Sequence, residues 1–121
     1  MTALAALFLW MLATVPWAGQ TVQNIKAVEV ALVVARYFPV EARQTAMCIG
    51  YWETRGEPYS NDLVGAAGEV SVWQIHPIHF NRFDRRQLIV DMGYATWAAR
   101  QLYDESGFAP WSTAPLCKGD R

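Results

Sequence analysis

The feature that most constrains the fold is a set of apolar stripes whose members recur at steps of three and four residues. The clearest stripe consists of Leu88, Met92, Ala95, Ala99 and Leu102. This spacing is typical of one buried face of an α-helix. Asp84 and Gln87 precede the stripe with the spacing of a capping box, and Gly107 follows it as a stop signal. The sequence therefore predicts one helix between Asp84 and Gly107.

Two earlier segments show the same periodicity. The stripe in residues 24–38 consists of Ile25, Val28, Ala31, Leu32 and Ala35. The stripe in residues 40–54 consists of Ala42, Ala46 and Ile49. Gly, Ser, Asn, Asp and Pro are frequent in residues 55–70, which indicates a loop or a short hairpin. Residues 70–75 fit either a short strand or the start of a helix. We expect an α+β domain that is predominantly α-helical, with a small loop or β segment in the middle.

The N-terminus is strongly apolar. Residues 1–20 contain no charged side chain, and residues 3–15 form a nearly unbroken apolar run. A run of this length fits the core of a signal peptide and is short for a membrane span, but no Lys or Arg precedes it. Four interpretations stay open: a cleaved signal, a retained membrane anchor, a hydrophobic part of a larger assembly such as a virion or a secretion apparatus, and a buried core helix. We treat residues 1–20 as a signal or membrane anchor segment and residues 21–121 as one domain, and we expect an exported, extracytoplasmic or membrane-anchored protein.

The composition argues against several classes of protein. Hydrophobic residues make up 53% of the chain and charged residues 17%, which is too apolar for a disordered protein. A formal net charge of -1 gives no basic excess for binding nucleic acid. Cys48 and Cys117 lack the spacing of a zinc site, and His76 and His79 lack further ligands, so no metal and no cofactor is predicted. The cysteines form either a disulfide or two buried thiols, and the signs of export favour the disulfide.

Glu53 occupies the next position of the stripe in residues 40–54, close to the predicted end of that helix. A carboxyl group on a buried face is partly desolvated, which raises its pKa and lets it act as a general acid. Cleavage of a glycosidic bond requires such an acid. The competing interpretation is a Glu at a helix end that forms a salt bridge with Arg43 or Arg55.

Three blocks of the sequence carry a resemblance to a known family. Residues 46–58 contain a small-residue helix that ends in Glu53-Thr54, followed by Gly and Pro. In residues 65–76 a glycine-containing loop leads into Trp73-Gln74-Ile75, and residues 82–117 end with Pro-Trp and a Cys. In this order the blocks resemble the lytic transglycosylases of the lysozyme-like superfamily, in their short actinobacterial or phage-borne form. The resemblance implies a lysozyme-like fold that cleaves the β-1,4 bond between MurNAc and GlcNAc in peptidoglycan glycan strands.

The resemblance also implies roles for individual residues. Glu53 protonates the glycosidic oxygen and then acts as a base. The substrate-binding residues that it implies are Thr54, Trp73, Gln74, Tyr94 and Trp111. Thr54 replaces the family's Ser, and Trp73 is either a core residue or a stacking face. If water rather than the MurNAc 6-hydroxyl attacks, Asp62 and Glu69 are candidates for a partner carboxylate, although a solvated loop charge is the simpler interpretation of each. Ser71 stands where many members have Gly.

Two hypotheses from other classes compete with the enzyme. One is a sugar-binding or structural module that kept the fold and lost turnover. The other is a membrane-anchored or virion assembly protein in which residues 1–20 do the main work. An acid at position 53 favours the enzyme, because a binding module has no need of one.

Overall fold

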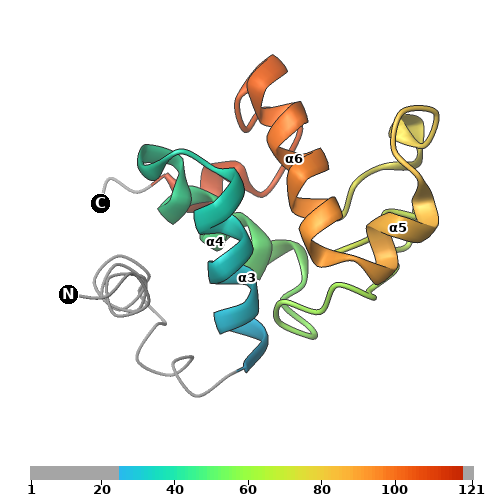
Figure 1. Ribbon diagram of the computed structural model, residues 1–121, viewed down its shortest axis with the longest axis horizontal. Coiled ribbons are helices and arrows are strands. Elements are labelled where there is room, and N and C mark those ends of the chain that lie inside the picture. Colours follow the sequence, from blue (N-terminus) through green and yellow to red (C-terminus); the bar gives the residue numbers. More distant parts are fainter. Residues whose placement is uncertain (1–24, 119–121) are drawn as a thin grey trace.

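A computed structural model describes residues 25–118, and the apolar segment 1–20 lies outside these residues. The chain in this range is predominantly helical (Figure 1). The α-helices are α3 (Ile25–Tyr37), α4 (Arg43–Glu53), α5 (Arg85–Val90) and α6 (Met92–Ser106). The 3-10 helices are η1 (Val40–Ala42), η2 (Pro77–His79) and η3 (Ala114–Cys117). None of the helices in this range is long and apolar enough to cross a membrane.

The buried face of α3 differs from the predicted stripe. The residues that α3 buries are Ala27, Val30, Ala31 and Val34. Ile25 and Leu32 belong to the predicted stripe but are 71% and 45% exposed. Aliphatic residues occur almost all round this helix, so the periodicity does not single out one face. The contacts with α4 and α6 favour the side on which two alanines allow close approach.

The stripe that leads to Glu53 is confirmed. Ala42, Ala46 and Ile49 are at most 3% exposed. The segment begins with the turn η1, and α4 follows it and ends at Glu53. Arg43 donates hydrogen bonds to the carbonyl oxygens of Phe38 and Ala35, which satisfies carbonyl groups at the end of α3. α4 therefore follows directly on α3 and packs against it.

The predicted helix between Asp84 and Gly107 is two helices. Asp84 caps α5 through a hydrogen bond from the backbone N–H of Gln87, and Gly107 ends α6 with a φ of 61°, both as predicted. Asp91 interrupts the run with an extended backbone, and its Oδ1 accepts the N–H of Tyr94 to cap α6. The side chain of Asp91 thus begins a new helix without disturbing the apolar stripe, because Leu88 and Ala95 both remain buried.

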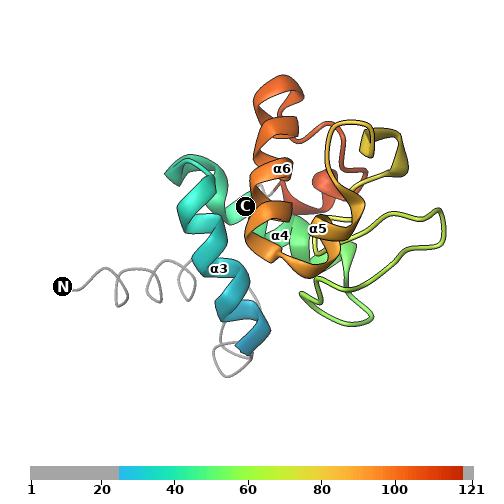
Figure 2. The same cartoon turned by 45° about the vertical axis from the view of Figure 1, so that its right-hand side comes forward.

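The middle of the chain is a loop held by two isolated antiparallel bridges, and residues 70–75 form neither the short strand nor the helix start that the sequence allowed, because a turn separates Val70 from Ile75. Antiparallel bridges join Val64 to Val70 and Val70 to Ile75, and no longer strand occurs within residues 25–118. We call residues 64–75 the hairpin. In Figures 1 and 2 the loops that follow residue 63 extend away from α3, whereas Ser60 lies beside this helix and accepts a hydrogen bond from Lys26. The hairpin is nevertheless tied to the core, since Trp73 is 1% exposed and its ring centroid lies 5.9 Å from that of Phe38.

Candidate active site

Glu53 is the last residue of α4 and is half-buried at the edge of the core. Burial raises the pKa of its carboxyl group above the usual value. A hydrogen bond from Thr113 opposes this rise in pKa, and the negative charge of Glu69 adds to it. The net effect favours the protonated carboxyl group, which is the form that a general acid requires.

Neither of the two arginines that the sequence suggested as partners forms a salt bridge with Glu53. Arg43 is engaged at the end of α3. The guanidinium carbon of Arg55 lies 5.6 Å from the centroid of the Trp52 ring. Within residues 25–118, the ion pairs between side chains are Arg82 with Glu105 and Arg100 with Asp104. Glu53 is therefore held by a neutral hydroxyl group instead of a cation.

The hydroxyl group of Thr113 donates a hydrogen bond of 2.8 Å to Oε2 of Glu53. Thr113 precedes η3, which packs against α4. A disulfide between Cys48 and Cys117 joins these two elements, with a Cα–Cα distance of 5.7 Å, as the sequence favoured. Sequence reasoning missed Thr113. The sequence indicated this contact only indirectly. A disulfide between Cys48 and Cys117 brings the residues just before Cys117 close to the end of the helix that contains Cys48.

The hairpin reaches the same region through Trp73. The indole ring lies directly over Gly50, one helical turn before Glu53, where a Cβ atom would be 3.5 Å from the ring. Its Nε1–H donates to the hydroxyl of Thr96 on α6, and its backbone carbonyl accepts the indole N–H of Trp111 at 2.8 Å. Trp73 therefore links the hairpin to α4, to α6 and to the C-terminal segment. Its role is that of a core residue, and the stacking face considered from the sequence is absent in this conformation.

Two other predicted sugar contacts are also buried. Thr54 is 1% exposed; its hydroxyl donates to the carbonyl of Gly50 and accepts the backbone N–H of Tyr59. It thus ends α4 and directs the chain into the next turn. Trp111 is 5% exposed and uses its indole N–H inside the protein. The structure makes both residues supports of the site, because neither offers a side-chain face to a ligand.

Gln74 and Tyr94 are partly exposed but lie in different surroundings. The amide group of Gln74 donates to the backbone carbonyls of Leu63 and Ser71, which holds its side chain inside the hairpin. The hydroxyl of Tyr94 accepts the backbone N–H of Asp84, and its ring lies 5.5 Å from that of Trp97. Gln74 follows the residue that covers α4, whereas the contacts of Tyr94 are with the start of α5 and with α6.

The backbone of Ser71 adopts a conformation that glycine usually adopts. Its φ is 78°, in the left-handed region where glycine is favoured, and Gln74 has a φ of 45°. The hydroxyl of Ser71 accepts the backbone N–H of Trp73, which helps to hold this conformation. Strained residues of this kind persist where the surrounding structure holds them, and they cluster at functional sites.

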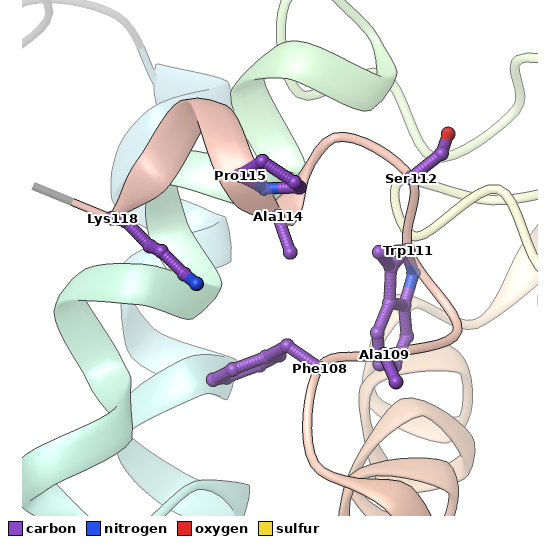
Figure 3. A pocket seen from close by; sticks show the side chains of 7 residues that line it. All are labelled: Phe108, Ala109, Trp111, Ser112, Ala114, Pro115 and Lys118. Atoms are coloured by element: carbon purple, nitrogen blue, oxygen red, sulfur yellow. The ribbon is translucent and has the colours of Figure 1, made fainter.

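The C-terminal segment also borders an open pocket. We call residues 108–118 the strap. A pocket of about 510 Å³ is lined by Phe108, Ala109, Trp111, Ser112, Ala114, Pro115 and Lys118. Figure 3 shows the ammonium group of Lys118 directed into it and the hydroxyl of Ser112 directed away. The lining residues stand on both sides of Thr113 in the chain, so the pocket lies along the strap that holds Glu53.

The histidine pair is not arranged as a metal site. Nδ1 of His76 accepts the backbone N–H of Ile78 and caps η2. Among residues 25–118, no three side chains of the metal-binding types come together. Burial lowers the pKa of His79, and the nearby positive charge of Arg82 lowers it further. Both histidines lie at η2, after the hairpin.

Comparison with protein-family models, with curated proteins and with solved structures finds no match to this chain. The candidate site therefore rests on its own geometry. Three segments meet there: the end of α4 with Glu53, the hairpin with Trp73 and Gln74, and the strap with Thr113.

Proposed function

We propose that this protein is a peptidoglycan-cleaving glycosidase with a lysozyme-like fold, in which Glu53 is the general acid. The observation that carries the proposal is the state of Glu53. Its carboxyl group has a raised pKa, has no cationic partner among residues 25–118, and is oriented by one hydroxyl donor. A carboxyl group that bears only a structural charge gains nothing from this arrangement, whereas a proton donor depends on it.

The orientation of the carboxyl group suggests which oxygen carries the proton. Oε2 of Glu53 accepts the hydrogen bond from Thr113, which leaves Oε1 to hold the acidic proton. In the proposed reaction Oε1 gives this proton to the oxygen that joins MurNAc to GlcNAc, and the bond between that oxygen and the anomeric carbon breaks. The carboxylate that remains then serves as a base, either for the MurNAc 6-hydroxyl or for water.

The choice of substrate rests on the resemblance of three blocks to the lytic transglycosylases. The blocks at 46–58, 65–76 and 82–117 are far apart in sequence. In the structure the first supplies Glu53, the second supplies the hairpin, and the third supplies the strap. Such convergence is expected if all three belong to one active site. The disulfide supports the proposal that the protein works outside the cytoplasm, where disulfides persist and the cell wall lies.

The test is digestion of purified peptidoglycan by the full chain, with the released sugars identified by mass. The wild type is expected to release muropeptides, and Glu53→Gln to release at least about a hundredfold fewer while still binding the polymer. Glu57→Gln is the matched control, because Glu57 is exposed and lies just beyond the end of α4. Wild-type protein that is folded and yet releases nothing would overturn the enzyme and favour the sugar-binding or assembly hypothesis.

A further inference from the structure

The pocket along the strap has an apolar wall that is held in place by the core. The ring of Phe108 lies 6.1 Å from that of Phe38 and 6.0 Å from that of Trp111, measured between centroids. Trp111 is fixed further by its hydrogen bond to the carbonyl of Trp73. The wall is therefore formed before any ligand binds. The volume of the pocket, about 510 Å³, is within the usual range for the binding site of a small ligand.

One positive charge faces this apolar wall. Figure 3 shows the ammonium group of Lys118 directed into the pocket. None of the residues that line the pocket is an Asp or a Glu. Within residues 25–118, the ion pairs between side chains are those of Arg82 and Arg100, and no acidic side chain pairs with Lys118. The described part of the chain thus places this ammonium group beside an apolar surface and gives it no counter-charge.

These features favour a particular kind of ligand. An ammonium group attracts an anion, and this attraction is stronger beside apolar atoms than in open water. Phe108, Ala114 and Pro115 offer apolar contact to small groups such as methyls. The hydroxyl of Ser112 points away from the pocket (Figure 3), so the polar side-chain group directed into it is the ammonium of Lys118. A neutral sugar ring would gain little here, because its hydroxyl groups need several partners.

We propose that this pocket binds the peptide stem of peptidoglycan, with Lys118 paired to the carboxylate at the end of the stem and the apolar wall in contact with alanine methyl groups. This inference rests on the proposed function. The N-acetylated sugars of the glycan strand are neutral, because the lactyl carboxyl group of MurNAc is joined to the peptide. The carboxylates of the polymer belong to these short, alanine-containing peptides. The preferred substrate is therefore a strand that still carries its peptides.

The pocket begins close to the acid. Ser112 and Ala114 line it, and Thr113 between them donates the hydrogen bond to Glu53. An extended peptide spans about 3.3–3.6 Å per residue, so a stem of about four residues covers roughly 13 Å. A stem of this length joins a sugar at Glu53 to a pocket that starts one residue from Thr113. Binding of the stem then holds the MurNAc that carries it near Glu53, which lowers KM.

The first experiment measures binding alone, with the full chain. The probe is N-acetyl-D-alanyl-D-alanine, which has a free carboxylate, and its C-terminal amide is the uncharged control. The acid is expected to shift the NMR signals of the Trp111 indole N–H and of the Ala109 and Ala114 amides. Lys118→Gln should bind the acid about threefold more weakly, which is the effect of one exposed ion pair. Arg86→Gln is the matched control, because it removes an exposed positive charge from α5 and Arg86 does not line the pocket.

The second experiment measures cleavage of soluble peptidoglycan strands and of the same strands after an amidase has removed their peptides. The wild type is expected to have a KM about threefold lower on the peptide-bearing strands. Lys118→Gln should raise the KM for these strands to the value for stripped strands. Arg86→Gln should keep the wild-type preference. Thermal unfolding verifies that each variant is folded.

The outcomes separate this inference from the proposed function. Equal KM values of the wild type on the two kinds of strand, or dipeptide binding that Lys118→Gln leaves unchanged, would overturn the inference and leave the glycosidase in place. Shifts as large with the amide or with inorganic phosphate would also overturn it, because they would show no selection of a peptide carboxylate. A folded wild type that binds the dipeptide but cleaves neither strand would overturn the proposed function alone.

Discussion

Removing the disulfide between Cys48 and Cys117 should affect both the stability of the fold and the acidity of Glu53. The bond closes a loop across a sequence separation of 69 residues. Closing a loop this long reduces the conformational entropy of the unfolded chain. This loss stabilises the native state by about 4 kcal/mol. A domain of this size has a total stability of about 5–15 kcal/mol. The variant with both cysteines changed to Ala should therefore lose a large fraction of its stability.

The effect on Glu53 follows from the strap. The disulfide holds η3 against α4, and Thr113 stands four residues before Cys117. When the strap loosens, the hydrogen bond from Thr113 is weakened, and this bond lowers the pKa of Glu53. The pKa of Glu53 should therefore rise further. A general acid works only while protonated, so the alkaline limb of the rate profile should move to higher pH.

The measurement is urea unfolding followed by tryptophan fluorescence, for the oxidised wild type, the reduced wild type and the double Ala variant. Thr113→Val is the matched control, because it keeps the disulfide and removes the hydrogen bond. It should cost about 1 kcal/mol of stability and still move the alkaline limb upward. A loss below about 1 kcal/mol for the double variant would refute the entropic argument. If the alkaline limb of the rate profile does not move in Thr113→Val, the strap does not control the pKa of Glu53.

Three further changes test other parts of the site. Glu53→Gln should be more stable than the wild type near pH 7 but not near pH 3. The pKa of Glu53 is higher in the folded than in the unfolded protein, so the wild type loses stability as the pH rises through the folded-state pKa. Thermal unfolding at both pH values measures this difference. Thr54→Val should lose about 1–3 kcal/mol in urea unfolding, since it leaves the buried backbone N–H of Tyr59 without its acceptor. Trp111→Phe should lose a similar amount by the same assay, as the carbonyl of Trp73 loses its donor, and an unchanged midpoint would contradict its supporting role.

Local signals in the sequence determined much of the fold. The caps at Asp84 and Gly107 act on neighbouring backbone groups, so their effect could be predicted without knowledge of the rest. The stripe before Glu53 consists of Ala42, Ala46 and Ile49, and all three are buried as predicted. The apolar residues of α3 surround the helix, and there the predicted face was wrong.

Only the tertiary structure decided what surrounds the acid. Thr113 is 60 residues from Glu53 in sequence, and no periodicity reports on a contact across such a distance. The burial of Thr54, Trp73 and Trp111 likewise depends on how the hairpin and the strap close over α4. The sequence alone was enough to place a carboxyl group on a buried helix face, because that is a property of one helix. Its acidity and orientation come from segments that meet only when the chain is folded.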